Sequence, residues 1–292
     1  KIAEVCLQYL DWAETYYQID GVPSQEFLNV RSALGDFVDL FGNRPASELG
    51  PRLILKLQDA LVEADYARTT INGRVSRVKR ALRWCASREI IPGSVAESIW
   101  TVDGLHKGRT RAREPKPVKP VPAEVVAATL PFLSPIVAAM VQVQYLCGMR
   151  PQDVCAMRLM DIDRSSSIWI YRPESHKNTW RGKELIKAVP PAAQQLLEPF
   201  LDRADDVYLF SPRESIAWWN QQRSRKTRQF PCEIRAVEKR KKLTMKRRGG
   251  RPLSSRYSTC SYGKSIVVAV EKANKAGASV PVWHPNQLRH SI

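Results

Sequence analysis

The sequence has six cysteines but no C-x-x-C pair, and it has few acidic residues for its length. Without cysteines at ligand spacing, neither a zinc site nor a dense disulfide framework is indicated, so we expect reduced thiols in a cytosolic protein. Clustered carboxylates and Cys/His ligand spacing are also absent, and no metal or other cofactor is expected. The chain begins with Lys1 and lacks the signal-peptide pattern of a basic head, an apolar middle and a small-residue cleavage site.

The sequence also lacks an uninterrupted apolar run of membrane-spanning length. Residues 125–149 carry no charge over 25 residues, which is long enough to cross a bilayer. However, Pro131, Ser134, Pro135 and two glutamines interrupt the stretch, and a proline at the start of the second apolar run is typical of a first helical turn. We therefore expect two buried core helices here and no membrane span.

Positive charge is what the sequence has in excess, with 46 Lys and Arg against 29 Asp and Glu and a net charge of +17. The 43% of hydrophobic residues can build real cores and the 292 residues suggest two domains, which excludes a disordered basic tail. Residues 106–120 and 235–251 carry net charges of +5 and +8, and the rest of the chain is close to neutral. Two short basic strips therefore indicate a polyanionic partner.

The first hundred residues have helical patterning only. Ser24 precedes an apolar stripe, Pro51 opens another, and Thr69 is an expected N-cap for a helix that runs past Cys85. The patterns predict a bundle of four helices over residues 1–101. Four basic side chains of the last helix lie within a sector of about 120°. This sector is either a phosphate-facing surface or an ordinary solvated face. The four side chains are those of Arg74, Arg77, Arg80 and Arg88.

Residues 102–121 are rich in proline, glycine and basic side chains and have no apolar periodicity, which favours an extended linker. This linker suits contact with a nucleic-acid backbone, and its alternative role is that of a solubilising tether. The second domain, residues 122–292, mixes helices with strands at 167–172, 185–189 and 207–210. A basic insertion at about 222–256 has almost no apolar anchors and is expected to be mobile.

Three segments of the second domain carry side chains suited to phosphate chemistry. Arg150 lies in a turn between two helices, with Asp153 placed to hold the first turn or the Arg itself. Lys177 lies in the turn between the first two strands, and Asn286 and Arg289 lie near the start of the last helix, where phosphate is attracted. Taken singly, such residues are more often structural salt bridges or inert turn lysines.

In this order, the segments resemble the tyrosine recombinases, or phage-type integrases. That family has an Arg in a turn of the form T/C-G-x-R-x-x-E/D, a Lys in a β-hairpin and a late H-x-x-R-H segment. Here the corresponding sequences are Cys147-Gly-Met-Arg-Pro-Gln-Asp153, His-Lys177-Asn-Thr-Trp-Arg-Gly and Asn286-Gln-Leu-Arg-His290. Residues 68–84 likewise resemble the last part of the family's helical core-binding domain, so the resemblance covers nearly the whole chain.

The resemblance implies an all-α core-binding bundle that binds DNA and a mixed, mainly α catalytic domain with a small antiparallel β-sheet. It implies site-specific cleavage and rejoining of double-stranded DNA through a 3′-phosphotyrosyl intermediate, by a homo-oligomer that is a dimer on a site and a tetramer in a synapse. We expect a cytoplasmic, nucleoid-associated recombinase of a mobile element. The implied catalytic residues are Arg150, Lys177, Asn286 and Arg289, supported by Asp153, His284 and His290, and the DNA-binding candidates are Arg74, Arg77, Arg80, Lys107, Arg109, Arg111 and Arg113.

The chain departs from the family pattern at two places. Asn286 stands where the family commonly has His, and an amide can hydrogen-bond a phosphate oxygen but cannot act as an acid or base near neutral pH. The chain also ends at Ile292, before the family's last His or Trp and its nucleophile, so we expect that tyrosine beyond this residue; Tyr257 and Tyr262 are poor candidates. The alternatives are a recombinase-like protein that binds DNA without cutting it and a type IB-like topoisomerase.

Overall fold

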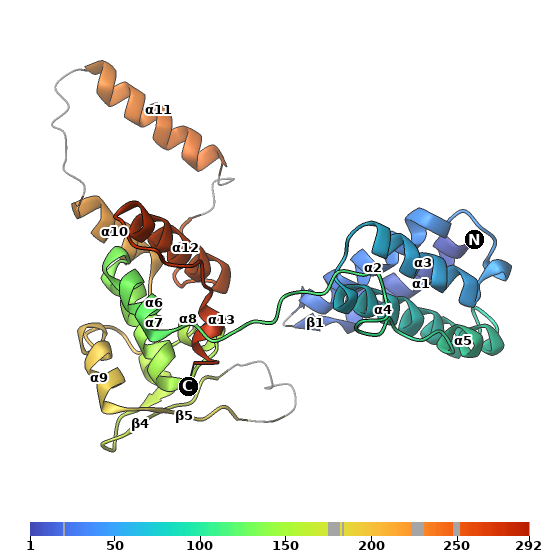
Figure 1. The fold of residues 1–292 in the computed structure, drawn as a ribbon, viewed down its shortest axis with the longest axis horizontal. Helices are drawn as coiled ribbons and strands as arrows, with labels where there is room; N and C mark the ends of the chain where they lie inside the picture. The colour runs from blue at the N-terminus through green and yellow to red at the C-terminus, as the bar shows by residue number, and fades with distance from the viewer. Residues whose placement is uncertain (20, 175–181, 183, 223–230, 248–251, 292) are drawn as a thin grey trace. The chain divides into compact units, whose positions relative to one another are not determined.

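The computed structural model describes residues 1–19, 21–174, 182, 184–222, 231–247 and 252–291. The chain divides into two compact units, residues 1–117 and 118–292 (Figure 1). Among the described residues, no helix has both the length and the apolar character needed to cross a membrane.

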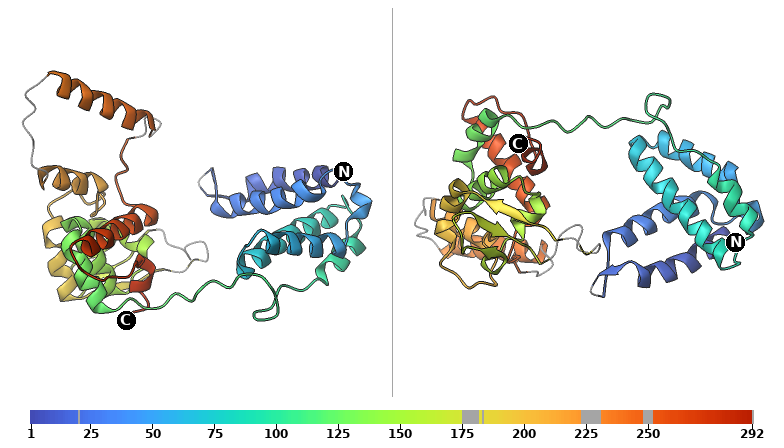
Figure 2. Two further views of the ribbon diagram at one scale, coloured as in Figure 1. Left: turned by 45° about the horizontal axis from the view of Figure 1, so that its top comes forward. Right: turned by 90° about the horizontal axis from the view of Figure 1, so that it is seen from below.

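Unit 1 is a helical bundle, which Figure 2 shows in blue to teal from two further directions. Its core consists of the apolar stripes of the longer helices, with Val30, Leu34 and Phe37 packed on Ile71 and other residues of the same core. A short hairpin, β1 (Gln18–Ile19) and β2 (Val22–Pro23), lies between the first two helices. The described helices are α1 (Ile2–Tyr16), α2 (Gln25–Phe41), η1 (Ala46–Glu48), α3 (Pro51–Glu63), α4 (Arg68–Ser87) and α5 (Gly93–Trp100).

The bundle differs in detail from the expected one. The Ser24 hydroxyl caps α2 by accepting a hydrogen bond from the Phe27 amide, as predicted. However, α4 begins at Arg68 rather than after a Thr69 cap, and the described part of unit 1 has five α-helices instead of four. The extra helix, α5, was missed because it is only 8 residues long, too short for a repeated apolar stripe.

The first half of the segment 102–121 is packed rather than extended. Val102 and Ala112 are buried in the core of unit 1, and the Leu105 amide donates to the Asn72 side chain at 2.8 Å. The Arg68 amide also donates to the carbonyl of Arg113 at 2.9 Å. The tightly linked part of unit 1 therefore extends well beyond residue 101.

Unit 2 surrounds one central helix, α7, most of whose residues are buried. Its antiparallel sheet has the order β3-β4-β5, with Ile162 paired to Tyr171 and Tyr171 paired to Lys187. The helices are α6 (Ala123–Thr129), η2 (Leu130–Phe132), α7 (Pro135–Cys147), α8 (Pro151–Cys155), η3 (Leu159–Asp161), α9 (Pro191–Leu197), η5 (Glu198–Phe200), α10 (Pro212–Gln222), α11 (Pro231–Arg247), α12 (Thr259–Lys275) and α13 (Pro285–Leu288), and the strands are β3 (Ile162–Asp163), β4 (Trp169–Tyr171) and β5 (Lys187–Val189).

The predicted fold class is confirmed, because an all-α bundle is joined to a mainly helical unit with a small antiparallel sheet. One prediction within unit 2 is wrong. Residues 207–210 do not form a strand, since Tyr208 makes only an isolated bridge to Arg158. The basic insertion contains the helix α11, and its mobility stays a prediction.

Candidate functional site

The turn that carries Arg150 is fixed by its neighbours in the chain. Helix α7 ends at Gly148, whose φ of 59° lies in the left-handed region that glycine adopts without strain. Pro151 then opens α8, and the buried Asp153 carboxylate accepts a hydrogen bond from the Arg150 amide at 3.2 Å. Asp153 therefore holds the first turn of α8. Arg150 itself is half-buried, and its guanidinium makes no hydrogen bond or ion pair with the described residues.

The segment that carries Asn286 and Arg289 begins with a single helical turn that buries Pro285 and Leu288. The His284 amide donates to the Gln287 side chain at 2.8 Å, which closes the start of α13. Asn286, Arg289, His284 and His290 are all exposed, and their side chains form no hydrogen bond with the described part of the chain. Their polar atoms are therefore available to a ligand.

A buried glutamine joins these two segments. Gln144 lies on α7 with no exposed surface, and its Nε2 donates to the carbonyl of Met149 at 3.2 Å and to the carbonyl of Pro285 at 2.7 Å. Met149 directly precedes Arg150, and Pro285 directly precedes Asn286. One side-chain amide thus holds the backbone next to Arg150 against the backbone next to Asn286.

The Arg289 segment is also tied to the start of unit 2. Gln287 donates to the carbonyl of Lys119 at 2.9 Å, and the Ser291 hydroxyl donates to the carbonyl of Val121 at 2.9 Å. The Val121 amide in turn donates to the Ser291 hydroxyl at 3.1 Å. Arg289 therefore lies between two anchored residues, so its backbone is held while its side chain stays exposed.

Lys187 brings a further cation to the Arg150 turn. It lies on β5, is half-buried, and its Nζ donates to the carbonyl of Gly148 at 3.3 Å. Burial raises the pKa of the neighbouring Cys147 thiol to about 12, and the Lys187 charge opposes that rise. Lys177, the lysine predicted from the sequence, lies outside the described residues.

Sequence reasoning missed both Gln144 and Lys187. Gln144 appeared only as an interruption of an apolar run, although a polar side chain on a buried helix must find hydrogen-bond partners and so signals a tertiary contact. Lys187 appeared only as part of a strand. The partners of these residues lie 141 and 39 positions away in the chain, and nothing in the local sequence identifies them.

Tyr257 and Tyr262 are buried, as expected for residues that are not the nucleophile. Burial raises the pKa of Tyr257, and it raises the pKa of Tyr262 well above its ordinary value. A hydroxyl in such a position neither reaches a DNA phosphate nor ionises readily.

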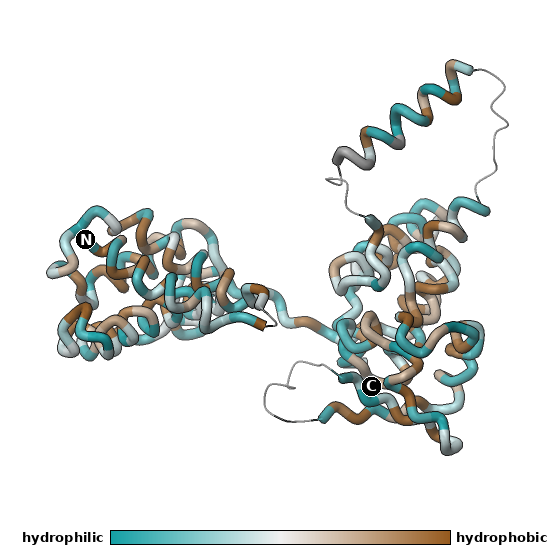
Figure 3. The backbone as a smooth tube through the Cα atoms, turned by 180° about the vertical axis from the view of Figure 1, so that it is seen from behind, coloured by the Kyte–Doolittle hydropathy of each residue, from teal (hydrophilic) through white to brown (hydrophobic). Residues whose placement is uncertain are grey.

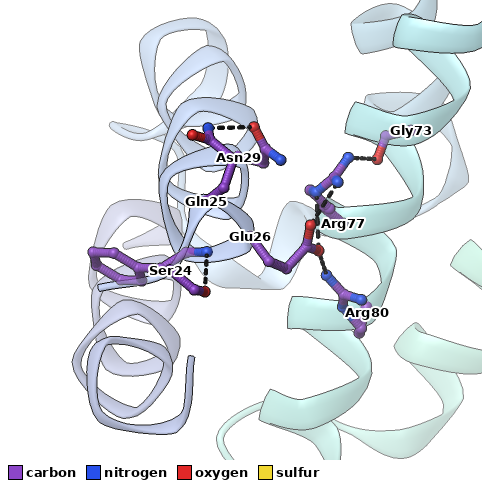
Figure 4. Close-up of polar contacts among 8 residues, drawn as sticks. Ser24, Gln25, Glu26, Asn29, Gly73, Arg77 and Arg80 are labelled. Carbon is purple, nitrogen blue, oxygen red and sulfur yellow. Dashed lines mark hydrogen bonds and ion pairs between the residues drawn. The ribbon is translucent and has the colours of Figure 1, made fainter. Parts of the chain in front are cut away.

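The α4 arginines are paired with carboxylates of α2. Arg77 donates to both oxygens of Glu26 at 3.1 and 2.7 Å, and Arg80 donates to one of them at 2.6 Å (Figure 4). Arg74 pairs with Asp36. Burial alone would raise the pKa of Glu26, but the hydrogen bonds from Arg77 and Arg80 outweigh it and lower the pKa. The expected phosphate-facing sector is thus an ion-paired face, and DNA contact through it stays a prediction that requires phosphate to replace these carboxylates.

The candidates of the segment 102–121 are exposed. Arg113 pairs with Asp65 at 3.4 Å, whereas Lys107, Arg109 and Arg111 form no ion pair with the described residues. Among the described residues, no group of three or more His, Cys, Asp or Glu side chains is arranged to hold a metal ion.

Comparison with protein-family models and with curated proteins finds no match for this sequence. Solved structures do match over nearly the whole chain. A dimer of lambda integrase residues 75–356 bound to a COC′ core site is 12% identical with a TM-score of 0.60, covering 98% of this chain and 84% of the other. The Tn1549 transposon integrase, residues 82–397, in complex with circular intermediate DNA is 13% identical with a TM-score of 0.57 and the same coverage.

A lambda integrase tetramer bound to a Holliday junction is also similar, at 13% identity and a TM-score of 0.59, covering 98% of this chain and 68% of the other. These likenesses show that the chain has the tyrosine recombinase fold, and they confirm the resemblance seen in the sequence at the level of the fold.

Proposed function

We propose that this protein is a site-specific DNA recombinase, of the integrase type, that cleaves and rejoins DNA strands through a 3′-phosphotyrosyl intermediate. The observation that carries the proposal is the bridge through Gln144, which joins the Arg150 turn to the Asn286–Arg289 segment. The same two segments resemble the arginine motifs of the tyrosine recombinases, whose fold this chain has.

The chemistry requires cations at the phosphate. A tyrosine oxygen attacks the phosphorus, the bond from phosphorus to the 5′-oxygen breaks, and a 3′-phosphotyrosine forms. Negative charge grows on the non-bridging oxygens during attack, and the forked guanidiniums of Arg150 and Arg289 neutralise it. The departing 5′-oxygen takes a proton from Lys177. The phosphotyrosine bond takes the place of the broken phosphodiester bond, so a second strand can be joined to the phosphate without an external energy source.

Asn286 and the nucleophile complete the proposed site. The Asn286 amide donates a hydrogen bond to a phosphate oxygen, in place of the His that the family commonly has. In the tyrosine recombinases the nucleophile follows the second arginine motif, so the proposal requires a tyrosine beyond residue 292; Tyr257 and Tyr262, which precede Arg289, are buried. Duplex DNA is the proposed partner, bound by both units, with a homo-oligomer assembled on it as in the integrase dimer and tetramer described above.

A second candidate is a recombinase-like protein that binds DNA without cutting it. Asn286 favours this alternative, because its side-chain amide can neither accept nor give up a proton near neutral pH. A cleavage assay separates the two functions.

Trapping on a nicked suicide substrate tests the proposal. The protein expressed from its complete gene is expected to form a covalent adduct with DNA from which the short cleaved fragment has diffused away. Arg150→Ala and Arg289→Ala should each lower the trapping rate by at least about 10²-fold while most DNA binding remains, because each removes a donor to the growing charge.

Arg164→Ala is the matched control, since Arg164 is an exposed arginine of the same unit, next to β3 and away from both segments in the sequence. It should trap at the wild-type rate. Trapping by Arg289→Ala at the wild-type rate would remove that arginine from the site, and a wild-type protein that binds DNA but never traps would support the binding-only alternative.

A further inference from the structure

Helix α11 is a surface without an assigned role. It spans Pro231–Arg247 within the basic insertion, and none of its described side chains is buried; Val237 is half-buried and the others are exposed. Figure 3 shows the helix mostly in hydrophilic colours, with hydrophobic residues at scattered positions. Ile234 and Leu243 are each 49% exposed, so packing on a core does not account for the helix.

The basic residues of α11 form a stripe. Arg235, Lys239 and Lys242 follow the spacing i, i+4 and i+7. At 100° per residue, these three positions fall within a sector of about 60° that runs about 10 Å along the helix. The acidic residues of the helix, Glu233 and Glu238, lie outside that sector, and the described residues of the stripe form no ion pair.

Such a stripe opposes helix formation in the free protein. Like charges three and four residues apart repel each other on a helix, and the stripe contains 235 with 239 and 239 with 242. A polyanion with regularly spaced charges removes this repulsion. The surface is therefore complementary to a partner that is negative along a line, as the phosphate backbone of a duplex is.

We propose that α11 is a DNA-backbone-binding helix, and that its basic stripe, defined as Arg235, Lys239 and Lys242, contacts successive phosphates. The inference rests on the proposed function for its partner, duplex DNA, but not on strand cleavage. It adds to unit 2 a phosphate contact that is separate from the Arg150 and Arg289 segments. Because phosphate contacts carry no sequence information, α11 strengthens binding on every sequence alike.

A salt titration with paired variants tests the inference. The double variant Lys239→Gln/Lys242→Gln removes two charges from the stripe, whereas Arg240→Gln/Arg247→Gln removes two charges centred more than about 100° away on the same helix. In a plot of log affinity for a 30-base-pair duplex against log salt, the stripe variant should lower the slope by about two, since each phosphate contact contributes about 0.9. The control variant should leave the slope unchanged.

Hydrogen exchange provides the second readout. Amides of residues 231–247 should gain protection when the duplex is added to the wild-type protein, and the stripe variant should gain less. Equal slope changes in the two variants, or no change in either, would overturn the inference. Protection on phosphatidylglycerol vesicles without protection on DNA would also overturn it, because the partner would then be a membrane.

The failure of this inference and the failure of the proposed function are distinguishable. If α11 contacts only the backbone, the stripe variant is still trapped on the suicide substrate at saturating protein concentration. If the wild-type protein is trapped normally but both double variants have the wild-type salt slope, only the α11 inference fails. If the stripe variant shows the slope change but the wild-type protein is never trapped, only the proposed recombinase function fails.

Discussion

At the scale of single residues, the buried amide of Gln144 joins the two distant segments of the proposed site. Its Nε2 donates hydrogen bonds to the carbonyls of Met149 and Pro285. Neither carbonyl touches a ligand in the proposed reaction, so Gln144 is a positioning residue. Its importance lies in geometry, because a misplacement of about 1 Å at a reacting centre costs on the order of 10²-fold in rate.

We therefore predict that Gln144→Met separates cleavage from binding. Methionine has a similar size but donates no hydrogen bond, so the two segments lose their shared anchor. The maximal trapping rate should fall by about 10-fold to 10²-fold, while the DNA concentration for half-maximal trapping stays nearly the same. The measurement is single-turnover trapping over a range of DNA concentrations.

The control is Gln142→Met on the same helix. The Gln142 side chain is half-buried and donates only to the carbonyl of Ala138, within its own helix, at 3.3 Å. Its loss should leave trapping unchanged. If both variants lose trapping equally, or if Gln144→Met weakens binding as much as trapping, the positioning role is wrong.

Lys177 and Lys187 can be told apart by their response to a substrate with a better leaving group. When sulfur replaces the bridging 5′-oxygen of the substrate, the leaving group is a thiolate, which needs no proton from the enzyme. Lys177→Met should be slow on the ordinary substrate and restored on the sulfur substrate. Lys187→Met should be restored on neither, because Lys187 holds the carbonyl of Gly148 rather than a leaving group; the opposite pattern would make Lys187 the proton donor.

The Arg150 turn was predictable because its signals are local: a glycine ends one helix, a proline opens the next, and an aspartate three residues on holds the first turn. Gln144 and Lys187 were not predictable, since their roles depend on partners brought together only by the tertiary structure. The same holds for the α4 arginines. Their common face could be inferred from the helical period, but the carboxylates of α2 that neutralise it could not.

At the scale of elements, the contact between α2 and α4 links the charge state of Glu26 to the stability of unit 1. Its pKa lies below the ordinary value of 4.5 in the folded protein. A carboxylate with a lowered folded pKa stabilises the fold above its unfolded pKa, and this contribution is lost as the pH falls through the folded value. Glu26 is one-third exposed, so we expect about 0.5–1 kcal/mol, the range of a solvent-screened pair.

We predict that Glu26→Gln lowers the free energy of unfolding by that amount at neutral pH. The effect should disappear as the pH falls through the lowered pKa of Glu26, because the wild-type carboxylate is then protonated as well. Urea unfolding at several pH values measures this difference. Glu63→Gln, at the exposed end of α3, should change neither value. A Glu26→Gln variant with wild-type stability at pH 7 would show that the pairs with Arg77 and Arg80 add nothing.

Elements with a repeated apolar stripe could be predicted from the sequence, and those without one could not. Helices α2, α4, α7 and α12 each bury several residues at helical spacing. Helix α11 buries none, which is why its sequence was interpreted as mobile. Residues 207–210 have the composition of a strand but find only one bridging partner, Arg158, so no ladder forms.

At the scale of the whole molecule, the net charge of +17 indicated a polyanionic partner without identifying a reaction. The fold is that of the tyrosine recombinases. Much of the charge lies in the segments 106–120 and 235–251, and we propose a DNA-backbone contact for helix α11 of the second segment. The proposed chemistry depends instead on three cations, Arg150, Lys177 and Arg289.

The central claim is that these cations serve strand cleavage by a tyrosine. The most direct test is to digest the adduct formed on a nicked substrate by the protein from its complete gene and to identify the DNA-linked residue by mass spectrometry. We predict a tyrosine outside residues 1–292, joined to the 3′-phosphate of the cleaved strand, and no adduct with Arg289→Ala. An adduct on Tyr257 or Tyr262, a linkage to a 5′-phosphate, or no adduct from wild-type protein bound to its DNA would contradict the account.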